Sequence, residues 1–214
     1  MPNNAAVDEV LQAGPVIPVI LIDDADKAVP LARALLEGGV RVLEVTLRTP
    51  AAMEAIRRIR GEVPGVLLGA GTVLSARQLE EVAKLDLAFA VSPGVTPALL
   101  EAADSLPLPL LPGTATASEV MVLLERGYTR MKLFPAEQVG GVSLLKALSS
   151  PLQAAKFCPT GGITVETART YLALPNVICV GGSWLTPADA VRAGDWGRIT
   201  DLARAASTLG RAPG

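Results

Sequence analysis

A lysine inside an apolar segment is the first residue of this chain that could do chemistry. Lys132 lies in Arg130-Met131-Lys132-Leu133-Phe134-Pro135, a short run that predicts a buried strand. Burying an ammonium group without a partner is costly, whereas a lysine that gives up its proton keeps a neutral amine there. A neutral amine is a nucleophile that can form a Schiff base with a carbonyl compound. The alternative is a lysine whose aliphatic stem lies along the strand while its charged end reaches water.

Three polar side chains alternate with apolar ones in a second predicted strand. Because side chains of a strand alternate between its two faces, Glu44, Thr46 and Arg48 share one face, and the valine and leucines between and beside them share the other. A carboxylate can shuttle protons, and an arginine can bind a substrate carboxylate through two hydrogen bonds. A buried ion pair between Glu44 and Arg48 is the structural alternative.

Two glycine pairs follow later strand candidates. Gly161-Gly162 comes after a strand expected at 156–160, and Gly181-Gly182 comes after one expected at 177–180. Paired glycines expose backbone N–H groups to which an anion can come close. In a barrel of alternating strands and helices, the loops after the last two strands frequently form a phosphate site. Either pair alone would more often be an ordinary turn.

These residues depend on the elements that carry them, and apolar segments alternate with helical patterns along the chain. The strand candidates are residues 16–22, 42–47, 66–71, 87–92, 108–112, 130–135, 156–160 and 177–180. The helix candidates are residues 7–13, 26–37, 50–60, 75–84, 97–103, 117–126, 141–148, 165–172 and 197–209. This alternation predicts an α/β protein with a parallel sheet, and we expect a (β/α)8 TIM barrel with an extra N-terminal helix. An open doubly wound sheet would need a glycine-rich turn after the first strand, which residues 21–24 lack.

Length and composition restrict the class of protein. The chain has 214 residues, half of them hydrophobic, and no low-complexity linker, so we expect a single domain over residues 1–214. The net charge of -2 argues against a nucleic-acid-binding surface. No apolar run approaches the ~18 residues of a membrane span. Because residues 1–4 lack the features of a signal peptide, we expect a cytoplasmic protein.

The absence of histidine excludes several kinds of catalysis. Ser-His-Asp catalysis and every histidine-ligated metal site are ruled out. The two cysteines, Cys158 and Cys179, are too few for a metal cluster or a disulfide framework, so packing is the expected role of both. An Mg²⁺ site would need only oxygen ligands. Any acid–base step must use a carboxylate, a lysine, a tyrosine, a cysteine or water.

Several segments together resemble the class I 2-keto-3-deoxy-6-phosphogluconate (KDPG) aldolases, which also act as 4-hydroxy-2-oxoglutarate (KHG) aldolases. The resemblance covers nearly the whole chain. The matching segments are residues 14–20, 38–49, 69–74, 92–94, 132–137, 157–163 and 181–185. Glu44 with Arg48, followed by the strand lysine and by Pro159-Thr160-Gly161-Gly162, is a specific combination, whereas one glycine pair is not.

The resemblance implies a role for each candidate residue. Lys132 would be the Schiff-base lysine, and Glu44 would be the general acid–base, acting partly through water. The substrate contacts that it implies are Arg48 and Thr72 for the carboxylate, Pro93 and Phe134 for the reacting carbons, Thr160 for the hydroxyl, and Gly161, Gly162, Gly182 and Ser183 for the phosphate. It implies no metal and no organic cofactor, and it implies a homotrimer.

The implied reaction is the cleavage of KDPG to pyruvate and glyceraldehyde 3-phosphate, a step of the Entner–Doudoroff pathway. Cleavage of 4-hydroxy-2-oxoglutarate to pyruvate and glyoxylate is a second expected reaction. The alternatives are an aldolase that prefers the C4 epimer or an unphosphorylated keto acid, and another phosphate-binding barrel such as a decarboxylase or synthase. A barrel that only binds a sugar phosphate is the third, although a pure binding protein has no need of a nucleophilic amine.

Overall fold

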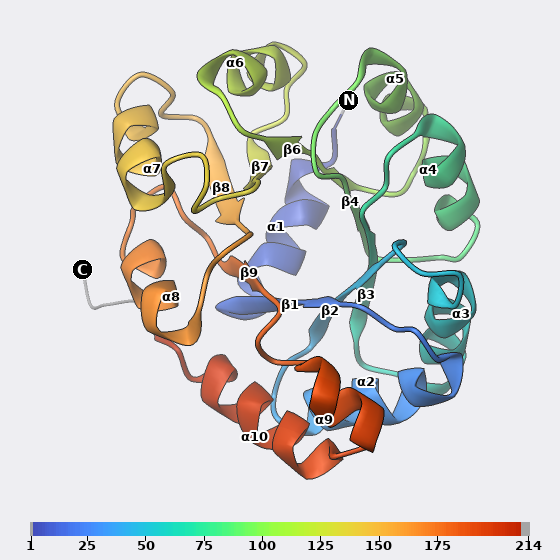
Figure 1. The fold of residues 1–214 in the computed structure, drawn as a ribbon. Coiled ribbons are helices and arrows are strands. Elements are labelled where there is room, and N and C mark those ends of the chain that lie inside the picture. The colour runs from blue at the N-terminus through green and yellow to red at the C-terminus, as the bar shows by residue number, and fades with distance from the viewer. Residues whose placement is uncertain (1, 211–214) are drawn as a thin grey trace.

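A computed structural model describes residues 2–210 of the protein; Met1 and residues 211–214, which the expected domain also includes, lie outside the described residues. Short strands occupy its centre, and helices surround them (Figure 1). The strands are β1 Val16–Ile20, β2 Val42–Thr46, β3 Leu67–Gly71, β4 Phe89–Val91, β5 Leu110–Leu111, β6 Gly113–Thr114, β7 Arg130–Leu133, β8 Lys156–Pro159 and β9 Val180–Gly182. Neighbouring strands pair in parallel, so their carboxyl ends lie at one edge.

Helices follow most of the strands, and capping residues mark the start of several of them. The helices are α1 Asn4–Gln12, the 3-10 helix η1 Ala25–Lys27, α2 Ala28–Glu37, α3 Ala52–Glu62, α4 Ala76–Ala83, α5 Pro97–Ser105, α6 Ala117–Glu125, α7 Gly141–Ser149, α8 Val165–Leu172, α9 Ala188–Ala193 and α10 Trp196–Ser207. The Ser75 hydroxyl accepts a hydrogen bond from the N–H of Gln78 at the start of α4. Pro97 occupies the first turn of α5, where its missing N–H costs nothing.

The strands form two sheets, so the expectation of a closed eight-stranded TIM barrel is wrong. Six strands form a curled half-barrel in the order β5-β4-β3-β2-β1-β9, and three form a small sheet in the order β6-β7-β8. Isolated parallel bridges, Phe157 with Val177 and Thr160 with Gly181, take the place of a continuous ladder between β8 and β9. The expected N-terminal helix is present as α1.

Two prolines explain where the ladder is interrupted. Pro112 separates β5, which pairs with β4, from β6, which pairs with β7. The carbonyl of Pro112 accepts a hydrogen bond from Lys132 on β7, but proline has no N–H to return on that side. On β8, Phe157 donates to Asn176, and Pro159 is the next residue that faces the same way. Each proline therefore removes a donor at a junction between the sheets.

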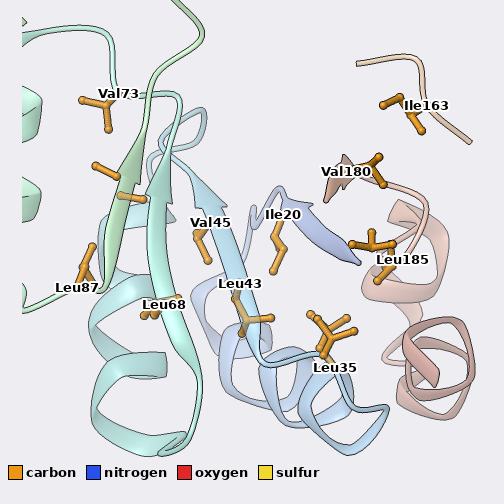
Figure 2. Close-up of a cluster of buried hydrophobic side chains, with 14 of the residues drawn as sticks. Ile20, Leu35, Leu43, Val45, Leu68, Val73, Leu87, Ile163, Val180 and Leu185 are labelled. Carbon is orange, nitrogen blue, oxygen red and sulfur yellow. The ribbon is translucent and has the colours of Figure 1, made fainter. Parts of the chain in front are cut away.

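Apolar side chains fill two separate layers. The outer layer lies between the strands and the helices, and Figure 2 shows part of it, including Ile20, Leu43, Val45 and Leu68. The inner cluster lies between the two sheets; its buried members are Val7, Val10, Leu11, Ile17, Val42, Phe89, Val91, Leu111, Cys158 and Cys179. Since α1 supplies the first three of these, it closes the interior at the amino-terminal ends of the strands. In Figure 1, α1 is seen in the middle of the view, with the strands around it.

Candidate active site

The ammonium of Lys132 and the carboxylate of Glu44 meet in the interior between the two sheets. Lys132 lies on β7 and Glu44 on β2, and 3.1 Å separates Nζ from Oε1. Their side chains are only 6% and 5% exposed. A buried charge is tolerated when it is paired and hydrogen-bonded, so each group offsets the cost of burying the other. The apolar segment around Lys132 gave no sign of a partner, but the structure provides one in Glu44.

Glycines on β3 provide the space for the carboxylate. Thr46 pairs in register with Gly71, and Glu44 pairs with Gly69. A Cβ atom at Gly71 would lie 2.2 Å from Glu44 Oε1, and one at Gly69 would lie 2.4 Å from the Phe89 ring. Any larger residue at either position would displace a side chain from the interior. The two glycines therefore admit the carboxylate at one level and an aromatic ring at the level below it.

The surroundings of the Lys132 amine are apolar on two sides. Cys158 of the inner cluster is the register partner of Lys132 on β8. The centroid of the Phe134 ring lies 5.5 Å from Nζ, within the usual range for a cation–π contact of about 6 Å. The inner cluster fills the amino-terminal side of the interior, which leaves the carboxyl ends of the strands as the side of approach to the amine.

Arg48 is held by a chain of hydrogen bonds at the carboxyl end of β2. Its Nε donates to Thr46 Oγ1 at 3.1 Å, and that hydroxyl donates to the carbonyl of Ile20 at 2.8 Å. The Glu44–Arg48 ion pair considered from the sequence is not formed, since Glu44 pairs with Lys132. Arg48 is exposed, so its remaining N–H groups can reach an anion.

Thr72 and Pro93 follow the next two strands at the same edge. Thr72 comes directly after β3 and has a φ of 58°, a left-handed conformation that residues other than glycine seldom adopt. Such backbone conformations cluster at functional sites. Pro93 lies close to β6, where a Cβ at Gly113 would be 2.3 Å from the carbonyl carbon of Pro93. Both side chains are half-buried beside the carboxyl ends of the strands.

The two glycine pairs lie side by side, because β8 and β9 meet where they occur. Thr160 is bridged to Gly181, and a Cβ at Gly181 would lie 2.2 Å from Thr160 Oγ1. Gly161 and Gly162 have φ values of 104° and 78°, which favour glycine. The Trp184 ring occupies the space that a Cβ at Gly182 would need. Ser183, between these two residues in the sequence, is exposed.

One pair of residues near this loop was missed by the sequence analysis. The hydroxyl of Tyr171 on α8 donates to Glu137 Oε1 at 2.6 Å. The two residues are 34 positions apart, and a tyrosine within a helical pattern gives no indication of such a partner.

Neither a metal centre nor a membrane span is found in residues 2–210. No group of three or more acidic, cysteine or histidine residues in this part of the chain could hold a metal ion. None of its helices is both long enough and apolar enough to cross a membrane.

Comparison with known proteins decides which family this arrangement represents. The sequence profile of the KDPG and KHG aldolases matches residues 7–202. The chain belongs to this family. It is 53% identical over 201 residues to the 2-dehydro-3-deoxy-phosphogluconate aldolase of Dickeya dadantii and to the KHG/KDPG aldolase of Escherichia coli, with 94% of each chain covered in both cases.

Solved structures of aldolases from this family share the fold. KDPG aldolase from Legionella pneumophila, with pyruvate captured at low pH as a covalent carbinolamine intermediate, superposes with a TM-score of 0.92 at 47% identity, covering 94% of this chain and 98% of that one. The Zymomonas mobilis aldolase with 3-phosphoglycerate gives 0.91 at 48% identity, covering 96% and 97%. The half-barrel with its small second sheet is thus the KDPG aldolase fold.

Proposed function

We propose that this aldolase cleaves KDPG to pyruvate and glyceraldehyde 3-phosphate through a Schiff base on Lys132. The observation that carries the proposal is the buried contact of 3.1 Å between Lys132 Nζ and Glu44 Oε1. It places a proton acceptor beside the amine that would attack the ketone. The names of the relatives support this substrate, and the Legionella pneumophila carbinolamine supports a class I, metal-independent lyase.

The first half of the reaction makes the imine. Glu44 takes a proton from the Lys132 ammonium, and the neutral amine adds to the C2 ketone of the substrate to form a carbinolamine. Glu44 returns the proton to the C2 hydroxyl, and water leaves. The protonated imine that remains withdraws electrons from the adjacent carbons.

The second half breaks the carbon–carbon bond. Glu44, acting partly through water, removes the proton of the C4 hydroxyl, and the electrons of the C3–C4 bond move into the imine. The aldehyde leaves, and the resulting enamine is protonated at C3. Water then hydrolyses the imine, which releases pyruvate and restores Lys132.

The polar groups at the carboxyl ends of the strands would hold the rest of the substrate. Arg48 and Thr72 would bind the carboxylate, and Pro93 and Phe134 would pack near the reacting carbons. Thr160 would contact the substrate hydroxyl. The phosphate would lie against Gly161, Gly162, Gly182 and Ser183. What supports this last assignment is the position of both glycine pairs at neighbouring strand ends, with Thr160 bridged to Gly181.

Cleavage of 4-hydroxy-2-oxoglutarate to pyruvate and glyoxylate is the second proposed activity. It is supported by relatives named KHG/KDPG aldolase, and it needs the same lysine and carboxylate. We further propose a place in the Entner–Doudoroff pathway and a cytoplasmic homotrimer. The relationship to bacterial metabolic enzymes supports the pathway and the compartment, the family resemblance supports the trimer, and sedimentation velocity would measure the oligomeric state.

Trapping the imine tests the mechanism directly. The protein is incubated with pyruvate and borohydride, and the reduced adduct is located by intact mass and peptide mapping. We expect one adduct, on Lys132, and none in the Lys132→Arg variant. The Lys156→Ala variant is a matched control, since the Lys156 ammonium lies at the surface and donates to the carbonyl of Pro175. An adduct on another lysine, or no adduct on a folded protein, would contradict the proposal.

A further inference from the structure

The loop that carries Gly161 and Gly162 packs directly on the segment that continues the Lys132 strand. The N–H of Ala136 donates to the carbonyl of Thr160 at 2.8 Å, and the N–H of Glu137 donates to that of Gly161 at 3.1 Å. A Cβ at Gly161 would lie 3.1 Å from Pro135 Cα. Residues 135–137 therefore support the glycine loop from the side of β7.

A side-chain hydrogen bond connects residues 135–137 to α8, the helix that follows the loop. Tyr171 is fully buried on α8, and its hydroxyl donates to Glu137 Oε1 at 2.6 Å. Burial, together with the Glu137 carboxylate, raises the pKa of Tyr171, so its hydroxyl keeps the proton that it donates. Because α8 begins directly after the loop, with Thr164 as its N-cap, the loop is held from both sides.

The Glu137 side chain places its methylene stem and its carboxylate against different glycines. A Cβ at Gly162 would lie 2.8 Å from both Glu137 Cβ and Cγ, so the methylene stem of the glutamate supports the loop. A Cβ at Gly141 would lie 2.7 Å from the Tyr171 hydroxyl and 3.7 Å from Glu137 Oε2, so both carboxylate oxygens are near Tyr171 and Gly141. The negative charge is thereby turned away from the glycine that the stem supports.

We propose that Glu137 and Tyr171 are positioning residues that hold the Gly161–Gly162 loop in its phosphate-binding shape. Two consecutive glycines with positive φ have little conformational preference of their own, so the loop needs support from its neighbours. The hydrogen bond supplies that support and fixes the Glu137 carboxylate away from the anion. This inference rests on the proposed phosphate site, and it assigns no contact between either residue and the substrate.

The Tyr171→Phe variant tests the proposal, because it removes the donor and keeps the buried ring. We expect the KM for KDPG to rise roughly tenfold. A change of this size corresponds to about the free energy of one hydrogen bond to a charged group. The kcat should change less than about twofold. The rate of borohydride trapping with pyruvate, which has no phosphate, should not change. Weaker inhibition by inorganic phosphate should accompany the higher KM.

Two variants of Glu137 separate positioning from general stability. Glu137→Gln keeps an acceptor for Tyr171, so its KM for KDPG should stay within about threefold of the parent. Glu137→Ala removes both the acceptor and the stem, and it should reproduce the Tyr171→Phe result. Thermal melting of each variant measures stability beside the kinetics. Equal losses in pyruvate trapping and in KDPG turnover would mean a merely structural role and would overturn the proposal, as would an unchanged KM for KDPG.

Ser183→Ala distinguishes this inference from the proposed phosphate site. If Ser183→Ala raises the KM for KDPG and Tyr171→Phe does not, the phosphate site stands and the positioning role is refuted. If neither variant affects KDPG more than pyruvate trapping, the phosphate site itself is refuted, and the positioning role with it. Selective losses in both variants support both assignments.

Discussion

Two ion pairs on β7 place one basic residue in a buried environment and the other in a partly exposed one. Lys132 and Arg130 are two positions apart on β7, and each has an acidic partner from another element. The Lys132 and Glu44 side chains are 6% and 5% exposed and share one contact of 3.1 Å. The Arg130 and Asp8 side chains are 22% and 24% exposed, and both Nε and Nη2 of the guanidinium reach the Asp8 carboxylate.

The difference between the two pairs follows from what each cation can do. Arginine keeps its proton under all ordinary conditions, and its planar fork matches a carboxylate through two hydrogen bonds. Arg130 therefore fastens α1 to β7, beside Asn4, whose amide donates to the carbonyl of Gly127 at 2.8 Å. Lysine can lose its proton, and its single contact leaves the amine able to attack a ketone. The comparison places an anchoring contact at the amino-terminal end of β7 and the proposed chemistry two residues further along.

Replacing Lys132, the proposed nucleophile, should have the largest effect. Lys132→Ala should lower kcat/KM by roughly 10⁴-fold and abolish borohydride trapping, because no other amine within residues 2–210 forms an ion pair with Glu44. It should also lower the free energy of unfolding by about 3–5 kcal/mol, since a buried carboxylate is left unpaired. Lys132→Arg keeps a positive charge and is the control: it should lose as much activity but less stability. Turnover by either variant near the parental rate would break the comparison.

Removing the carboxylate of Glu44, the proposed proton acceptor, should have the next largest effect. Glu44→Gln keeps a hydrogen-bond acceptor beside Lys132 but cannot take its proton, so kcat should fall by roughly 10²–10³-fold. Pyruvate should still be trapped by borohydride, although more slowly. Steady-state kinetics of pyruvate release, followed with a coupled dehydrogenase, measures the first effect. A normal kcat would show that Glu44 only balances charge.

Crowding the carboxylate should give a smaller loss of the same kind. A Cβ at Gly71 would lie 2.2 Å from Glu44 Oε1, so Gly71→Ala should push the carboxylate out of line with Lys132. We expect kcat to fall by roughly tenfold, as small misplacements of catalytic groups do. Gly61→Ala on α3 is the matched control, because a Cβ there meets nothing within 4 Å. Equal kinetics for the two variants would show that the alignment of Glu44 does not limit the rate.

Breaking the anchoring pair should change stability and leave the chemistry alone. Asp8→Asn removes the charge opposite Arg130, and the free energy of unfolding should fall by about 1–2 kcal/mol, measured by urea denaturation. The values of kcat and KM should stay within about twofold of the parent. A large loss of kcat without a change in stability would contradict the division of roles along β7.

The positions of the site residues along their own strands could be predicted from the sequence. The expected alternation on β2 is confirmed: Glu44 faces the interior, while Leu43 and Val45 lie in the outer layer beneath the helices. This works because alternation along a strand depends only on neighbouring residues. The expected membership of the KDPG and KHG aldolase family is also confirmed. The sequence could indicate it because the motifs of the family are short local segments.

The closure of the sheet could not be predicted in the same way. Pro112 and Pro159 are visible in the sequence, but a missing N–H interrupts a ladder only on the side that the residue faces. That side is set by the register with β7 and with the segment before β9. A pattern of alternating strands and helices, which predicts how many units there are, carries no information on this pairing.

The sequence by itself determined which side chains could be chemical: a lysine in an apolar strand, a carboxylate two positions from a threonine, and glycines at strand ends. Only the tertiary structure decided their partners. Lys132 and Glu44 are 88 positions apart, and Arg130 and Asp8 are 122 apart. Local propensity acts over a few residues, whereas these contacts depend on two sheets and a helix coming together around one interior. That assembly, more than any motif, gives Lys132 and Arg130 on β7 their different partners.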